Sequence, residues 1–126
     1  MTTLQITPKT TRTAAAADSS VAVDNTVVSP LNNWTLHLKV WSFTGTSNNT
    51  NRARLQWEDS VNAFSASLVG PTYNIVPTIN DPEGKLFTCR WRDFDAFRIG
   101  VASAVIRTNL TQITGGTIVY EAWLTW

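Results

Sequence analysis

The sequence predicts an all-β protein, an antiparallel β-sandwich or jelly-roll-like domain with an extended N-terminal arm. Two observations support this fold class. From residue 31 onward, short stretches of alternating apolar and polar residues recur, separated by clusters of Gly, Pro, Asn and Asp. In the same region, no stretch keeps the 3.6-residue period of a helix for more than a turn or two. Short strands without helices between them are typical of a sandwich.

The clearest strand is predicted over residues 34–41. There, Leu36 and Leu38 share one face, while His37 and Trp41 share the other. The same period-two pattern, less regular in places, predicts further strands over residues 53–57, 61–69, 73–79, 85–92, 97–109 and 117–126.

Turn and break signals separate these strands. The polar residues 58–60 are expected to end the strand over 53–57. Pro77 lacks a backbone donor and therefore favours an edge position for its strand. Gly100 interrupts a long strand and suggests a bulge. Gly115 and Gly116 predict a hairpin turn between the last two strands.

Residues 1–30 form a segment of distinct composition, because every Trp, Tyr and Phe of the chain lies outside it. Such a segment buries too little apolar surface by itself to offset its ordering entropy. We therefore expect an extended arm over 1–30 and a β-sandwich domain over 31–126. The arm is either a flexible tail or an interface that becomes ordered on a neighbouring subunit by adding to a sheet edge. The apolar residues that would make that contact are Leu4, Ile6, Val21, Val23, Val27 and Val28.

The composition narrows the function classes. With 126 residues and 43% hydrophobic content, the chain has room for one modest domain. Ten Lys and Arg against nine acidic residues leave a net charge of +1, which argues against a nucleic-acid coat. A single cysteine excludes an intrachain disulfide and favours a reducing compartment. Because we find neither a signal-peptide pattern nor a membrane-spanning stretch, we expect no membrane partner.

The residues that could support catalysis or metal binding are few. His37 and Cys89 are the only residues of their types, so zinc binding is disfavoured. The acidic pairs Glu58–Asp59 and Asp93–Asp95 could supply calcium ligands or a hydrolase's carboxylates, but they lack a ligand-spaced loop and have nearby arginines as partners. We therefore expect no enzyme activity, no catalytic residues, no metal and no cofactor.

The tryptophans point to a contact surface. Three of the six fall on apolar faces and are interpreted as core residues: Trp34, Trp57 and Trp91. By contrast, Trp41 and Trp123 fall on the polar faces of their strands. Exposed aromatic residues on a sheet often contact sugars or other proteins. The alternative is that the chain's own loops cover these two rings, and the sequence leaves both interpretations open.

Two stretches carry a resemblance to a known class of protein. They are residues 52–60, RARLQWEDS, and residues 105–123, VIRTNLTQITGGTIVYEAW. Together with the Thr- and Ala-rich N-terminal segment, they resemble small virion proteins of tailed bacteriophages, of the capsid decoration or cement type. Over residues 31–126 the resemblance lies in the general pattern of the sequence. Over the N-terminal residues 1–30 it lies in amino-acid composition only.

The resemblance implies a structural protein without enzymatic activity. Such a protein is made in the host cytoplasm and stabilises the shell on the virion's outer capsid surface. Its expected partners are the major capsid protein and copies of itself, as a homo-oligomer such as a trimer, with no nucleic acid and no membrane. Truncating residues 1–30 would then weaken particle binding and leave the sandwich folded.

Two alternatives remain from the sequence. The first is a carbohydrate-binding or tail-associated receptor-binding module that uses Trp41 or Trp123 as a stacking platform. The second is a small hydrolase that uses Asp93 or Asp95.

Overall fold

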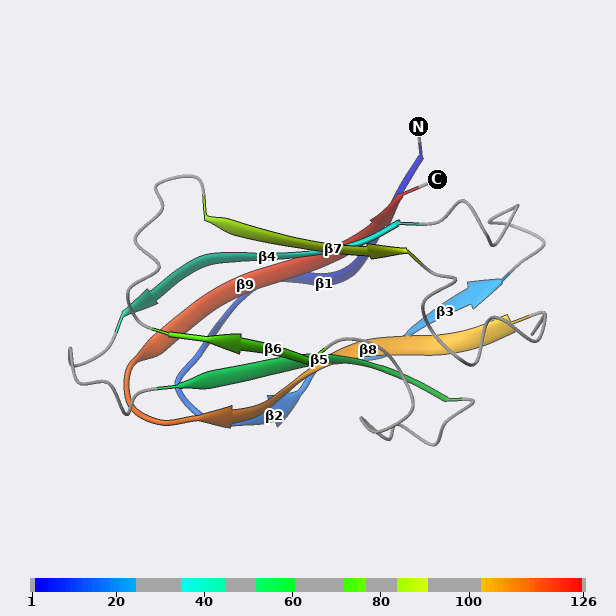
Figure 1. Ribbon diagram of the computed structural model, residues 1–126. Helices are drawn as coiled ribbons and strands as arrows, with labels where there is room; N and C mark the ends of the chain where they lie inside the picture. The colour runs from blue at the N-terminus through cyan, green and yellow to red at the C-terminus, as the bar shows by residue number, and fades with distance from the viewer. Residues whose placement is uncertain are drawn as a thin grey trace.

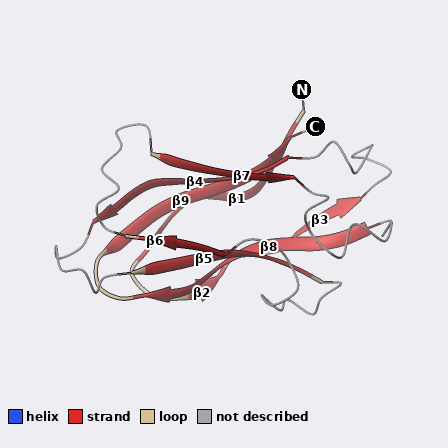
Figure 2. Cartoon of the chain, viewed as in Figure 1, coloured by secondary structure: helices blue, strands red, loops and turns tan. Residues whose placement is uncertain are grey.

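A computed structural model describes residues 2–24, 35–44, 52–60, 72–76, 84–90 and 103–125 of the chain. In these ranges every regular element is a strand, as Figure 2 shows. The strands are β1 (Thr3–Arg12), β2 (Ala16–Ala17), β3 (Val21–Asp24), β4 (Thr35–Thr44), β5 (Ala53–Asp59), β6 (Thr72–Ile75), β7 (Lys85–Arg90), β8 (Ser103–Ile113) and β9 (Thr117–Thr125).

The strands form two antiparallel sheets that pack face to face (Figure 1). The first sheet has the order β1-β9-β4-β7. The second has the order β2-β8-β5-β6, and β3 pairs with another part of β8. The predicted fold class is thus confirmed: the chain is all-β, with two packed antiparallel sheets.

The core lies between the two sheets because alternate side chains of each strand point inward. In β4 the residues Leu36, Leu38 and Val40 are buried and those between them are partly exposed, which confirms the predicted alternation. A register shift between Val40 and Ser42 then changes the phase of the strand, so that Phe43 is also buried. In β9 the same alternation buries the side chains of Ile118, Tyr120, Ala122 and Leu124. The second sheet contributes Trp57, the largest fully buried side chain, as expected for a core tryptophan.

The N-terminal segment, defined as residues 3–24, corrects the predicted domain division. Its first strand pairs with β9 of the same chain from Thr3↔Thr125 to Arg12↔Ile118, and β2 and β3 pair with β8. The segment therefore forms one edge of both sheets (Figure 1). Composition missed this arrangement because the apolar core residues with which the segment's Ile6 and Val23 cluster come from later strands.

The predicted arm contacts are correspondingly placed inside the chain's own sandwich. Ile6 and Val23 are each 2% exposed and belong to the core, and Leu4 and Val21 pack against it. Val27 and Val28 lie outside the described residues. Because four of the six residues pack in or against the core of the same chain, we now expect removal of residues 1–30 to damage the sandwich.

The link between β8 and β9 also differs from the prediction. Gly115 and Gly116 form a turn, and both have positive φ, 71° and 84°, which glycine adopts without steric cost. The two strands joined by this turn belong to different sheets, however, so the turn is not a hairpin. The pattern of glycines signals a reversal of the chain but does not specify which strand lies beside which.

The strand limits differ from the sequence expectations in a few places. β5 runs through Glu58 and Asp59, which are 2% and 0% exposed, so these polar residues do not end the strand. β6 lies at a sheet edge, as its neighbouring proline suggested. The expected strand over 61–69, the bulge at Gly100, Trp34 and Trp91 lie outside the described residues. Within the described part of the chain, no helix is long and apolar enough to cross a membrane.

Candidate functional site

The outer face of the four-stranded sheet is the surface that carries Trp41 and Trp123. Both rings are partly exposed, and they come from the neighbouring strands β4 and β9. They point away from the core because their sequence neighbours, Val40 and the pair Ala122 and Leu124, are fully buried. The predicted position of both tryptophans on the polar side of their strands is confirmed. We call this surface the outer face.

Trp41 is held by three charged side chains. The ammonium groups of Lys39 and Lys9 lie 3.6 Å and 4.4 Å from the centroid of its ring. Its indole N–H donates a hydrogen bond to Oε1 of Glu121 at 3.0 Å. A cation over an indole ring is favourable because the face of the ring carries partial negative charge. These contacts fix the ring's orientation before any partner arrives.

Trp123 stacks on His37 of the neighbouring strand. The ring centroids are 5.2 Å apart and the planes differ by 10°. The pairing follows from the register, which places His37 opposite Trp123. His37 Nε2 also forms a 2.8 Å hydrogen bond with the hydroxyl of Thr125. Burial against the sheet lowers the pKa of His37, so the ring is neutral at pH 7.

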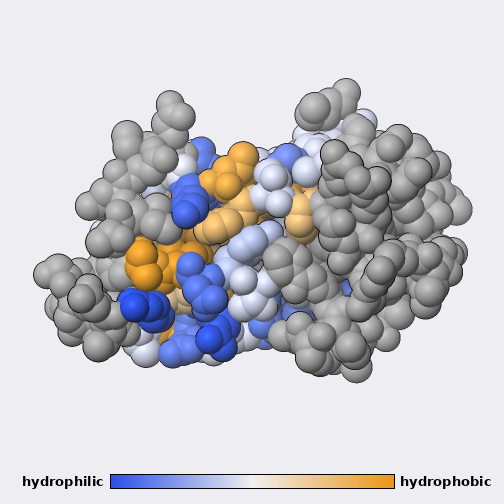
Figure 3. Space-filling model, viewed as in Figure 1, coloured by the Kyte–Doolittle hydropathy of each residue, from blue (hydrophilic) through white to orange (hydrophobic). Residues whose placement is uncertain are grey.

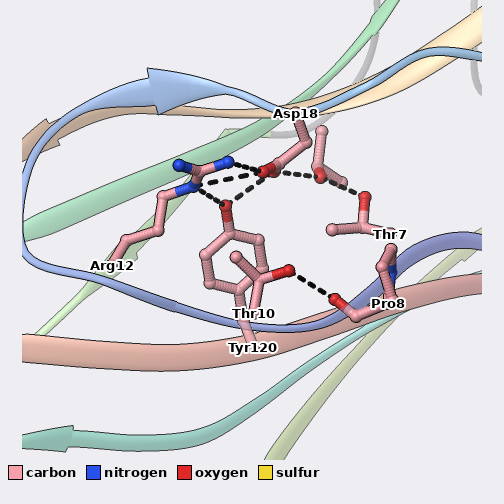
Figure 4. Close-up of polar contacts among 7 residues, drawn as sticks. Thr7, Pro8, Thr10, Arg12, Asp18 and Tyr120 are labelled. Carbon is pink, nitrogen blue, oxygen red and sulfur yellow. Dashed lines mark hydrogen bonds and ion pairs between the residues drawn. The ribbon is translucent and has the colours of Figure 1, made fainter.

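A second concentration of polar groups lies between the sheets (Figure 4). We call it the Asp18 cluster. Its members are Thr7, Arg12, Asp18, Thr108 and Tyr120.

The Asp18 carboxylate is the acceptor at the centre of this cluster. Oδ1 accepts from Nη2 and Nε of Arg12 at 2.6 Å and 3.2 Å. Oδ2 accepts from the hydroxyls of Tyr120 at 2.6 Å and Thr108 at 2.8 Å. Because Thr108 gives its proton to Asp18, Thr7 must donate in the 2.6 Å contact between the two threonine hydroxyls. A buried carboxylate with this many donors is well satisfied.

The cluster joins the N-terminal segment to both sheets. Arg12 comes from β1, Tyr120 from β9 and Thr108 from β8, while Asp18 precedes β3. The hydrogen bond that Arg12 donates to Asp18 holds the pKa of Arg12 above its usual value. Burial, followed by the hydrogen bond to Asp18, raises the pKa of Tyr120. The Tyr120 hydroxyl is therefore protonated at neutral pH and acts here as a donor.

A small pocket opens beside the Asp18 cluster. Its volume is about 170 Å³, and Ile6, Pro8, Thr10, Arg12 and Ser19 are among its lining residues. The Thr10 hydroxyl donates to the Pro8 carbonyl, and the Arg12 guanidinium is directed to Asp18. The polar groups at the pocket wall thus serve contacts within the protein.

Glu58 is the centre of a third group of polar side chains. This group lies on the side of the second sheet that faces away from the first sheet. Glu58 accepts from Nε of Arg107 at 2.8 Å and from Nδ2 of Asn109 at 2.9 Å, and Gln56 also donates to it. Arg107 and Asn109 face it because β5 and β8 pair Glu58 with Arg107 and Gln56 with Asn109. The Glu58 carboxylate thus pairs with an arginine, but its partner is Arg107 of the neighbouring strand and not one of the arginines at 90, 92 and 98 that were expected as partners.

The other residues that were considered for catalysis or metal binding are Cys89, Asp93 and Asp95. Cys89 is partly buried against the core. Asp93 and Asp95 lie outside the described residues. Across the described ranges, no three side chains of His, Cys, Asp or Glu gather in a way that could hold a metal ion.

Sequence reasoning missed the partners that organise both polar regions. Lys9 and Glu121 are distant in sequence from Trp41, and Asp18 is 102 residues from Tyr120. No local motif marks such contacts. The available signal was weaker: Lys39 and Trp41 share a strand face, as do Glu121 and Trp123, which predicts neighbours on a face but not their pairing across strands.

No family model, curated protein or solved structure matches the chain. The geometry of the outer face and of the Asp18 cluster is therefore the basis for assigning a role. The Asp18 cluster uses its polar groups within the chain, whereas the outer face presents two ordered aromatic rings beside charged side chains.

Proposed function

We propose that this chain is a non-enzymatic structural protein of a bacteriophage virion, which binds the outer capsid surface and stabilises the shell. The contact is made by the outer face, centred on Trp41 and Trp123. The observation that supports this proposal is the presence of two ordered tryptophans on one face of a sheet, surrounded by charged side chains. Aromatic residues are enriched in protein interfaces because they bury a large area at a low entropic cost.

The order already present in the outer face favours tight binding. Lys9, Lys39 and Glu121 orient the Trp41 ring, and His37 orients Trp123. Side chains that are ordered before binding lose less conformational entropy on association. On a shell with many copies of the same site, even a modest affinity per contact gives high occupancy when copies also contact each other.

In this proposal the outer face makes the contact, in place of the N-terminal segment. The N-terminal segment, predicted as the interface, packs its apolar residues in the chain's own core. Its contribution to the outer face is Lys9, whose ammonium lies over Trp41. We therefore assign binding to the outer face and not to Leu4, Ile6, Val21 or Val23.

The charges of the outer face suggest the character of the partner surface. Lys9 and Lys39 contribute two positive charges near Trp41, and Glu121 contributes one negative charge. An acidic patch on the shell would complement this face, and the attraction would weaken as salt screens the charges.

The first experiment counts this chain in purified particles. Large assemblies are banded from the producing lysate, and the chain is quantified against the major shell protein by mass spectrometry. A copy number comparable to that of the shell protein supports decoration. A few copies per particle would point to a tail or vertex component, and complete absence from particles would overturn the virion proposal.

A binding experiment then tests the outer face. Trp41→Ala and Trp123→Ala are each expected to reduce binding to stripped shells at least tenfold, as truncation of a central aromatic contact does. Val76→Ala is the matched control, because Val76 is an exposed apolar residue that directly follows β6 of the other sheet. Equal binding by all three variants would exclude the outer face as the contact.

Carbohydrate binding is the second candidate function, as a glycan-binding or receptor-binding module. It is favoured by the position of two indole rings on one sheet face beside the hydroxyl of Thr125 and the carboxylate of Glu121. The lysines over Trp41 and the imidazole against Trp123 count against it, because a sugar needs a free ring face for stacking. Loss of glycan-array binding in Trp123→Ala, with particle binding unchanged, would favour this alternative.

A further inference from the structure

We propose that β7 is a pairing edge for a second copy of this chain. Two chains would join β7 to β7 in antiparallel orientation, so that their four-stranded sheets merge into one continuous sheet across a two-fold axis. This inference concerns self-association and does not depend on the proposed function.

Among the described strands, β7 is a regular strand at the edge of its sheet. Its six residues pair with β4 in unbroken register, from Thr35↔Arg90 to Val40↔Lys85. Within the described residues, β4 is its only sheet neighbour. In an antiparallel strand, alternate residues direct their N–H and C=O groups to opposite sides. About half of the main-chain groups of β7 therefore point away from β4, where another strand can bind them.

The other sheet edges have features that discourage pairing. β1 contains Pro8, which cannot donate a hydrogen bond, and its register with β9 shifts between Gln5 and Thr7 and again between Thr7 and Thr10. Irregular register and proline are common protection for edge strands. On the second sheet, β2 has two residues, and β3 and β6 have four each, so they offer little length for pairing. Among the described edges, β7 is the one that is both regular and six residues long.

Apolar surface lies beside this edge. Leu86 on β7 is 50% exposed and is the exposed large apolar side chain of this edge; Val76, which is 36% exposed, follows β6 of the other sheet and is not part of β7. Figure 3 shows several hydrophobic side chains, with hydrophilic ones among them, left of the centre of the face that β6 and β7 line. Phe87 stacks on Tyr73 with a centroid distance of 4.3 Å, so the inward side of β7 is also aromatic. An exposed leucine on a regular edge is a favourable position for strand addition.

A second copy fits this edge because the strand is complementary to itself. In a symmetric antiparallel pair, outward residues must face outward residues. An axis at Phe87 places Leu86 opposite Thr88, and Phe87 opposite its own copy. Lys85 then faces Cys89, so no like charges are opposed along these five residues. Each copy would remove Leu86 from water, and the two phenylalanines would form a cross-strand aromatic pair.

Sedimentation velocity of the full chain over a range of concentrations tests the proposal. The unaltered protein is expected to sediment as a dimer at high concentration. Leu86→Lys is expected to raise the dissociation constant of the dimer roughly a hundredfold. Each of the two copies loses one contact, and each loss raises the constant about tenfold. Val76→Lys is the matched control, since it makes the same change at an exposed apolar residue outside β7, and it should dimerise as the unaltered chain does.

Two outcomes would overturn the inference. One is a monomer at every concentration, and the other is equal dimerisation of Leu86→Lys and the unaltered chain. Circular dichroism during thermal unfolding confirms that both lysine variants are folded. Because Leu86 is half exposed, its replacement should leave the fold intact.

Cross-linking tests the register. In a Cys89→Ala background, chains with Leu86→Cys are mixed with chains with Thr88→Cys and oxidised. The axis at Phe87 predicts a disulfide-linked heterodimer between the two variants. A linked homodimer of Thr88→Cys chains would instead place the axis at Thr88 and contradict the proposed pairing.

Discussion

Asp18 is the residue on which the interior polar cluster depends. It accepts hydrogen bonds from Arg12, Thr108 and Tyr120 and is itself buried. Asp18→Ala leaves these donors without their acceptor and removes the partner of the Arg12 charge. We expect it to lower the free energy of unfolding by about 3–5 kcal/mol, the usual cost of breaking a buried ion pair by removing one partner. Urea denaturation measures this difference.

Tyr120→Phe is the control for this substitution. It removes one hydroxyl donor but keeps the ring in the core, so we expect a smaller loss of about 1–2 kcal/mol. If Asp18→Ala were no more damaging than Tyr120→Phe, the carboxylate would not be the centre of the cluster.

The two tyrosines of the chain make a prediction for alkaline pH. Burial is the main cause that raises the pKa of both Tyr73 and Tyr120 in the folded protein. The unfolded chain ionises near pH 10. Below about pH 10 the tyrosines are protonated in both states, and their contribution to the free energy of unfolding is fully present. As the pH rises above about 10, this contribution is lost, because the unfolded state releases the two protons more readily than the folded state. Absorbance at 295 nm should therefore rise with unfolding, and not before it; an ionisation step near pH 10 in the folded protein would contradict this.

Gly84 makes a prediction at the scale of an element, because it precedes β7 and lies against β4. Its φ is +72°, and a Cβ at this position would lie 2.6 Å from the carbonyl oxygen of Val40. Gly84→Ala therefore adds a steric clash with backbone to the cost of a left-handed conformation. The conformational cost alone is about 1 kcal/mol. Because the clash adds to it, we expect Gly84→Ala to lower the free energy of unfolding by more than this.

Gly115→Ala is the matched control, since Gly115 has nearly the same φ, 71°, and is exposed. The difference between the two variants in thermal unfolding isolates the contact with β4. Equal destabilisation would show that β7 can shift without cost, which would weaken the case for a regular β7 edge.

The N-terminal segment acts as a part of the sandwich. It closes one edge of both sheets and contributes Ile6 and Val23 to the core. Deleting residues 2–24 should therefore abolish cooperative folding. Ile6→Ala, a milder test, should cost about 2–5 kcal/mol because it leaves a cavity in a packed core. Thr3→Ala, at an exposed position of the same strand, should stay within about 0.5 kcal/mol of the unaltered protein. A folded, stable truncated chain would show that the segment is dispensable.

At the scale of the whole molecule, the two sheets should unfold together. They share one core, and the Asp18 cluster connects β1 and β9 of the first sheet with β8 of the second. We expect one two-state transition, with coincident curves from far-ultraviolet circular dichroism and tryptophan fluorescence. Trp57 reports on the core and Trp41 on the outer face, so the fluorescence samples both regions. Two separate transitions would mean that the sheets, or the N-terminal segment, form independent units.

The sequence by itself determined the class of the fold and the faces of its best strands. Period-two alternation assigned Leu36, Leu38 and Val40 to the core and Trp41 and Trp123 to the polar side, and the structure agrees. This information is local, because burial of one strand face requires the same alternation whatever the neighbouring strand is. The glycines at 115 and 116 likewise signalled a turn from their own conformational freedom.

Only the tertiary structure decided which strands are neighbours. It placed β1 beside β9, moved β8 and β9 into different sheets, and brought Asp18 to Tyr120 and Lys9 to Trp41. The alternation of a strand is satisfied equally well by many partners, so the pairing depends on the joint packing of all strands around one core. For the same reason, a segment without aromatic residues could join a core whose other apolar residues come later in the chain.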